Sequence, residues 1–191
     1  MKKNHLLFIS LLIGILFFGC TKYKQVSYHF SALSLNLLNN SGAEPDVSTM
    51  DSLPAKAFGI RLNLHPITDS ETSGSFSAEH NYGVINTNTI SAIYISSSDS
   101  FDVDLPPGVC LNSKFIYYKG AYGSFDTIGC QSSIRPTNYY KNDYEQNYIP
   151  QYADILLIRP SSKYKIQRFK IKLTFKDNSQ FIDSTSLIKL Y

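Results

Sequence analysis

Hydrophobic and polar residues alternate along several short stretches of this chain. Every second residue from 26 to 30 is apolar or aromatic, and the alternation resumes from 33 to 37 after a shift of one position. A period of two places alternate side chains on one face, which is typical of a half-buried β-strand. The shift between the two stretches predicts a β-bulge.

Later stretches have the same character and are bounded by turn residues. They cover residues 58–64, 90–95, 115–118, 155–158, 169–175 and 181–190, and the last two are predicted to form a hairpin. His65-Pro66 is predicted to end a strand, Pro106-Pro107-Gly108 is a turn signal, and residues 43–55 and 68–83 are predicted loops. No window has a sustained helical period with caps. We therefore expect an all-β fold, namely an antiparallel β-sandwich with long loops. An immunoglobulin-like strand arrangement is one form that such a sandwich can take.

The first residues have a different pattern from the rest of the chain. Lys2 and Lys3 precede an apolar run over residues 6–18, which ends at Gly19 and Cys20. A charged start, a short apolar core and a small residue before the cut describe a secretory signal peptide. The run is shorter than the roughly 20 apolar residues that a spanning helix needs. Residues 1–19 are therefore predicted to be removed on export.

Residues 17–20 resemble the cleavage box of bacterial lipoprotein precursors, in which an apolar, a variable and a small residue precede a cysteine. The resemblance implies a diacylglyceryl thioether on Cys20 and cleavage before it, and two or more acyl chains anchor a protein stably. The alternative is a signal peptide cut elsewhere, with Cys20 incidental. We expect a lipidated tether over residues 20–24 and one domain over residues 25–191. The expected location is the cell envelope, at the outer membrane, and the sequence does not decide between its periplasmic and surface leaflets.

Charge excludes one class of partner. The net charge of the whole chain is +3, and removal of Lys2 and Lys3 leaves it close to neutral. A nucleic-acid-binding domain usually carries a basic excess, so no nucleic-acid partner is expected. The expected contact with the membrane is the N-terminal lipid.

Cys110 and Cys130 follow the signal peptide and would reach an oxidising compartment. A disulfide between them would stabilise the domain by roughly 3 kcal/mol on the chain-entropy model. Two buried free thiols are the alternative.

The residues that usually carry chemistry show no recognised spacing. The histidines lack a metal-ligand pattern, and Asp99, Asp102 and Asp104 form an acidic cluster that suits turns better than a cation site. No nucleophile elbow, phosphate loop or redox cysteine pair is present. We expect no catalytic residue, metal or cofactor.

Tyrosines concentrate in the irregular stretch 117–152. A tyrosine ring has an apolar face and a polar tip, which suits a binding surface. The candidate ligand-binding residues are Tyr122, Tyr139, Tyr140, Tyr144 and Tyr148. The alternative is that they pack a long loop onto the sandwich.

A second resemblance lies in short motifs over half of the mature chain. Residues 169–177 with 188–190, and residues 98–102 with 107–108 and 111–112, look like parts of small Bacteroidota lipoproteins of unknown function. That family implies no activity or site residues. The expected function is therefore a lipid-anchored, non-enzymatic binding or structural module for a protein or glycan ligand. The alternatives are a glycan-binding surface lipoprotein that uses residues 117–152, and an envelope hydrolase with a spatially assembled site.

Overall fold

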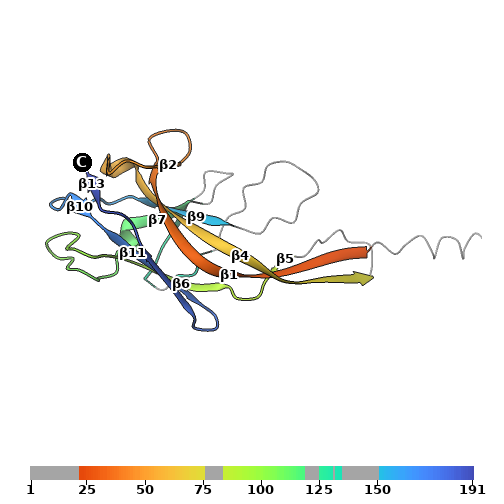
Figure 1. The fold of residues 1–191 in the computed structure, drawn as a ribbon. Coiled ribbons are helices and arrows are strands. Elements are labelled where there is room, and N and C mark those ends of the chain that lie inside the picture. The colour runs from red at the N-terminus through yellow and green to blue at the C-terminus, as the bar shows by residue number, and fades with distance from the viewer. Residues whose placement is uncertain (1–21, 76–83, 119–124, 131, 135–150) are drawn as a thin grey trace, which may run out of the picture.

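The computed structural model describes residues 22–75, 84–118, 125–130, 132–134 and 151–191 (Figure 1). These residues form β-strands, two short 3-10 helices and no α-helix. The strands are β1 (Lys22–Asn39), β2 (Asp46–Ser48), β3 (Ser52–Leu53), β4 (Phe58–Ser75), β5 (Val84–Asn86), β6 (Ile90–Ser97), β7 (Phe115–Tyr118), β8 (Phe125–Thr127), β9 (Tyr152–Leu157), β10 (Ile166–Gln167), β11 (Phe169–Phe175), β12 (Gln180–Ser184) and β13 (Ile188–Leu190), and the helices are η1 (Ala55–Ala57) and η2 (Asn112–Lys114).

The larger sheet runs in the order β2-β1-β4-β9-β7-β8. β5 pairs with Val26–Tyr28 of β1, on the same edge that β2 meets at Leu37–Asn39. Its central strands carry apolar residues with a period of two, and β9 is largely buried on both faces. The pairs on this path are antiparallel, whereas β5 runs parallel to β1.

The second layer joins β12-β11-β6 to β10-β13-β3. Only Arg168 separates β10 from β11, and the hydroxyl and N–H of Thr185 both bond to the backbone of Phe169 at that break. The strands β10 and β11 therefore form one side of a long hairpin, and β12 and β13 form the other side. The predicted hairpin is confirmed, and its turn contains Asn178 at a φ of 68°.

The strand order is that of an immunoglobulin constant-type sandwich. That fold has strands A, B, E and D in one sheet and C, F and G in the other. If the seven main strands are lettered in chain order, A to G are β1, β4, β6, β7, β9, β11 and β12. The first sheet then has the order A-B-E-D and the second contains C, F and G. The predicted all-β sandwich is confirmed, and its immunoglobulin-like form is the observed topology.

Aromatic and aliphatic side chains from both layers fill the space between them. Phe169 of β11 is fully buried and lies at the centre, stacked 5.3 Å from Phe58 and edge-on to Phe115 at 5.4 Å. Offset and edge-to-face pairs of this kind add about 0.5–1.5 kcal/mol beyond area burial. The core therefore joins β4 and β7 of one sheet to β11 of the other.

Two predicted boundaries are wrong. Residues 68–75, predicted as loop, continue β4, and residues 22–24, predicted as tether, begin β1. Both segments are polar, so they lack the apolar alternation on which the prediction relied. Pairing with each other makes them strand. The short elements β2, β3 and η1 also lie in or next to the predicted loop 43–55.

Candidate functional site

One row of side chains crosses five strands on the outer face of the larger sheet. Cα partners link Asn36 to Arg61, Arg61 to Asp154, Asp154 to Tyr118, and Tyr118 to Phe125. Residues paired in this way share a face. The row therefore places an amide, a guanidinium, a carboxylate and two aromatic rings side by side, from segments far apart in the sequence.

The phase of the core strands explains why this row faces outward. Ile60 and Leu62 of β4, and Ala153 and Ile155 of β9, are fully buried in the core. The alternate positions must face the other way. Arg61 and Asp154 are such positions.

Arg61 and Asp154 form the centre of the row. The Nε and Nη2 of Arg61 donate to the two carboxylate oxygens of Asp154 at 2.8 and 2.7 Å. The side chain of Asp154 is 3% exposed and that of Arg61 is 20% exposed. A bidentate pair of this kind is directional and strong, so it fixes both side chains against the sheet.

Tyr152 lies two residues before Asp154 on β9 and therefore on the same face. The guanidinium carbon of Arg61 lies 4.2 Å from the centre of its ring, within cation–π range. Burial raises the pKa of the Tyr152 phenol above its ordinary value; the Arg61 charge opposes this rise and Asp154 adds to it. The phenol is therefore protonated and able to donate a hydrogen bond at neutral pH.

The β7–β8 end of the row is aromatic. The rings of Tyr118 and Phe125 lie 5.3 Å apart with 43° between their planes. Phe125 is 50% exposed, and β8 is the last strand on that side of the sheet. This end offers aromatic surface to a ligand.

The β1 end is polar. The side-chain amide of Asn63 donates to the Asn36 carbonyl oxygen and to the backbone oxygen of Ser34. Asn36 is exposed. Amides therefore continue the polar surface beyond Arg61.

Close packing next to the row requires a glycine. A Cβ on Gly59 would lie 2.6 Å from a methyl of Leu156 and 2.9 Å from the oxygen of Ile155. Because Gly59 has no side chain, Leu156 packs flat over β4 beside the Arg61–Asp154 pair.

A cavity of about 540 Å³ lies by the same two edge strands. Its described lining is rich in hydroxyl groups and includes the carboxylate of Asp126: Tyr117, Asp126, Thr127, Ile128, Ser132, Ser133 and Ile134. Tyr117 is buried in the core cluster, so this cavity opens beside the core.

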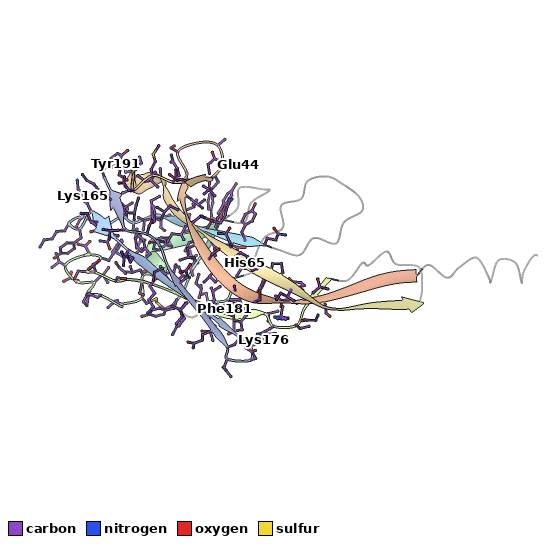
Figure 2. All side chains as sticks on the ribbon, viewed as in Figure 1. Glu44, His65, Lys165, Lys176, Phe181 and Tyr191 are labelled. Carbon is purple, nitrogen blue, oxygen red and sulfur yellow. A yellow bond between two sulfur atoms is a disulfide. The ribbon has the colours of Figure 1, made fainter. Side chains whose placement is uncertain are left out.

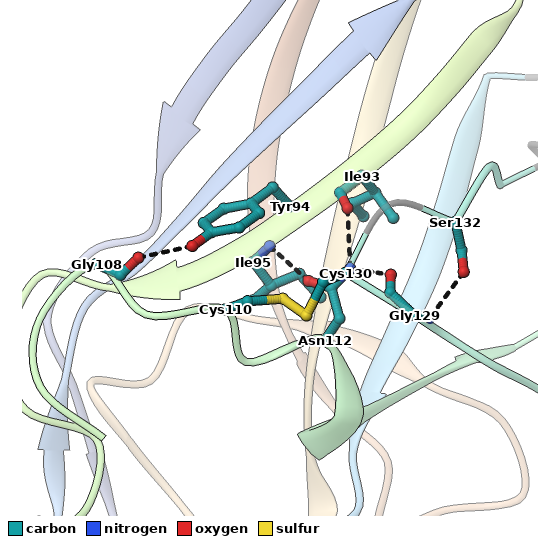
Figure 3. Close-up of a disulfide and its surroundings, with 9 residues drawn as sticks. All are labelled: Ile93, Tyr94, Ile95, Gly108, Cys110, Asn112, Gly129, Cys130 and Ser132. Carbon is teal, nitrogen blue, oxygen red and sulfur yellow. Dashed lines mark hydrogen bonds between the residues drawn. A yellow bond between two sulfur atoms is a disulfide. The ribbon is translucent and has the colours of Figure 1, made fainter. Parts of the chain in front are cut away.

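A disulfide between Cys110 and Cys130 lies next to that cavity, with its Cα atoms 6.1 Å apart (Figure 3). It joins the segment after β6 to the segment after β8. Beside it, the Oδ1 of Asn112 accepts the N–H of Ile95 at 2.7 Å, and its Nδ2 donates to the oxygens of Ile93 and Gly129. The bridge and this one amide together cover the open edge of β6.

Most of the predicted site residues lie outside the described residues. These are Cys20 and the tyrosines 122, 139, 140, 144 and 148. The described tyrosines of the same stretch, Tyr117, Tyr118 and Tyr152, lie on the two strands that bound it.

The acidic cluster forms turns, as expected. Asp102 accepts hydrogen bonds from the N–H of Val103 and the hydroxyl of Ser162, and the backbone bond from Val103 is the main cause that lowers its pKa. Within the described part of the chain, no three His, Cys, Asp or Glu residues gather as metal ligands would.

Sequence reasoning missed the outer row. Arg61 occupies an ordinary polar position of the alternating strand 58–64, and Asp154 directly precedes an apolar run, so neither residue is marked by the sequence. Their pairing across 93 positions depends on strand register.

In the portion of the chain that the structure describes, no helix has the length and apolarity to cross a membrane. No family model, curated protein or solved structure matches this chain.

Proposed function

We propose that this chain is a lipid-anchored lipoprotein of the bacterial outer membrane, and that its sandwich is a non-enzymatic module that binds a glycan on the outer row. The anchor rests on the residues that surround Cys20. The row from Asn36 to Phe125 is the observation that carries the ligand class.

The chemistry of the row suits a sugar ring. A pyranose has apolar C–H faces and a rim of hydroxyl groups. Aromatic rings such as Tyr118 and Phe125 pack against the faces, while planar amide and phenol groups such as Asn36 and Tyr152 exchange hydrogen bonds with the rim. The Arg61–Asp154 pair holds the centre rigid, which lowers the cost of ordering the site on binding.

A hydrolase is supported less well. Glycoside hydrolysis uses two carboxyl groups about 5–9.5 Å apart across the scissile bond. Of the described residues around the cavity, Asp126 alone has a carboxylate, and Asp154 is bound at both oxygens by Arg61. Binding without chemistry therefore fits the described geometry better.

The anchor is tested by Cys20→Ala. The wild-type precursor should incorporate labelled palmitate and be cleaved, whereas the variant should incorporate none and stay uncleaved, because the thioether needs the thiol. A Cys110→Ala/Cys130→Ala variant is the control and should still be labelled. Palmitate on the Cys20→Ala protein would reject the anchor.

The ligand is tested on a glycan array with the mature protein. Phe125→Ala should weaken binding to any captured glycan at least about tenfold, because an exposed aromatic contact is worth more than about 1 kcal/mol. Ile182→Ala is the matched control, since Ile182 is 53% exposed on β12 of the other sheet. Capture of no glycan, or equal binding by the Phe125 variant, would reject the proposed ligand class.

A further inference from the structure

Two strands of the larger sheet are far longer than the sandwich. β1 and β4 pair with each other from Lys22↔Ser75 to Asn39↔Phe58, but β9 pairs with β4 only between Gly59 and Asn63. Past Asn63, Leu64 of β4 and Tyr28 and Phe30 of β1 are still buried in the core, and β5 pairs with β1 over Val26–Tyr28. Beyond these residues the two strands leave the body as a ribbon (Figure 1). His65 lies where β4 leaves the body, and Lys165 and Tyr191 lie at the opposite end (Figure 2). We call the ribbon of residues 22–27 and 70–75 the arm.

The arm joins the body through two bulges on opposite strands. The register skips Ser31 on β1 and Asp69 on β4. A bulge bends its strand and increases the local twist. Pro66, which was predicted to end the strand, pairs with Phe30 next to the first bulge, where proline is tolerated. The two bulges form an elbow between body and arm.

Side chains of β1, β4 and the turn after β5 hold this elbow. The Asp69 carboxylate is hydrogen-bonded to Nδ1 of His29 and accepts the hydroxyl of Thr87 at 2.9 Å. The N–H of Thr87 donates to the oxygen of Tyr28 at 2.8 Å. At the other bulge, the Ser31 hydroxyl donates to the oxygen of His65 at 2.9 Å. Each bulge residue is therefore tied to a neighbouring segment.

The sequence of the arm is mostly polar, with Tyr23 and Val26 as its exceptions. Its register pairs include Lys22↔Ser75, Lys24↔Ser73 and Gln25↔Thr72. An isolated hairpin is marginally stable in water, but this one continues the pairing of a seven-stranded sheet, which fixes its register from one end.

We infer that the arm is a rigid stand-off that holds the sandwich at a fixed distance and angle from the membrane surface. The inference rests on the proposed lipidation of Cys20, which lies two positions before β1 begins. Six register pairs run from Lys22 to Ser27. The five intervals between them, at about 3.3 Å per residue, span roughly 17 Å.

A register-matched length series tests the stand-off. The lipidated chain, with its natural disulfide intact, carries a fluorophore at Lys170→Cys, an exposed position of β11, in vesicles that contain a lipid-bound acceptor. Deleting the two pairs Lys24↔Ser73 and Gln25↔Thr72 shortens the arm by about 7 Å without changing the face of any other residue. Energy transfer should rise in the deletion and fall when the same pairs are duplicated. Equal transfer in all three proteins would overturn the stand-off.

The elbow is tested by spin-label distances between Lys24→Cys and Lys170→Cys. The distance distribution should be as narrow as that of a pair within the body, Ser113→Cys with Lys170→Cys, and should broaden several-fold with Asp69→Ala but not with the exposed control Asp104→Ala. A broad distribution without the Asp69 change, or no broadening with it, would overturn the rigid elbow. The spin-label distances can be measured on protein without lipid, so the two proposals fail separately. Absence of palmitate labelling would reject the lipid anchor, whereas a broad distance distribution would reject the rigid arm.

Discussion

Asn112 shows how one side chain can replace a missing strand. On the side of β6 away from β11, its amide satisfies the N–H of Ile95 and the oxygen of Ile93, and it reaches the oxygen of Gly129 as well. The residue is fully buried. An open edge strand invites pairing with other chains, so this amide protects the sandwich as well as stabilising it.

Asn112→Asp should therefore destabilise the domain strongly. The carboxylate keeps the acceptor for Ile95 but loses both donor hydrogens, and it places charge against the oxygens of Ile93 and Gly129. Each buried group left unpaired costs about 1–3 kcal/mol, so we expect a lower midpoint of urea unfolding. Ser113→Ala, at the exposed neighbouring position, is the control. An unchanged midpoint for Asn112→Asp would contradict the role given to the amide.

The cysteines and this asparagine differ in what a sequence reveals. Two cysteines in an exported chain are enough to suggest a bridge, because the oxidising compartment favours it. Nothing in the sequence around Asn112 indicates three backbone partners. The sequence also gives no sign of the Arg61–Asp154 pair, because its two residues come together only through the register of β4 and β9.

At the scale of elements, apolar alternation predicted the strands that face the core. Residues 115–118 and 169–175 match β7 and β11 at both ends, and the shift between residues 30 and 33 is the observed bulge at Ser31. These segments alternate because one face packs against the other sheet, and that packing is the cause of the pattern.

The same rule failed where strands have no core to face. The arm is strand because two segments that lack apolar alternation pair with each other. Backbone pairing leaves no periodic signal in side-chain polarity. Pro66 added to the wrong boundary of β4, because it lies beside a bulge instead of ending the strand.

At the scale of the molecule, the sequence predicted the sandwich but left the strand order open. The neighbours β4 and β9 pair residues 89 to 97 positions apart, from Asn63↔Tyr152 to Gly59↔Leu156, and β3 and β13 pair residues more than 130 apart. Apolar alternation indicates that one face of a strand is buried. It contains no information on which strand pairs with it.

The last strand closes the second layer, which predicts a strong effect of a short truncation. Ile188 and Leu190 are buried, and Tyr191 exchanges backbone bonds with Leu53 and Ala55. Removing residues 188–191 exposes the core beside β3 and should lower stability by several kcal/mol, at about 1.5–3 kcal/mol for each buried aliphatic side chain. Circular dichroism during urea titration measures this.

Tyr191→Ala is the control for the truncation, because that side chain is 64% exposed. It should unfold close to the wild-type midpoint, since it keeps β13 and its backbone bonds. Equal stability of the truncated and full chains would show that β13 is dispensable.

The position of β13 also sets the timing of folding. β3 takes its neighbour from β13, more than 130 positions later in the chain, so the second layer cannot close before β13 is available. Contacts between residues so far apart in sequence are slow to form because a long loop must close first. We therefore expect the pairing of β3 with β13 to be a late step of folding, after the hairpin of β11 and β12.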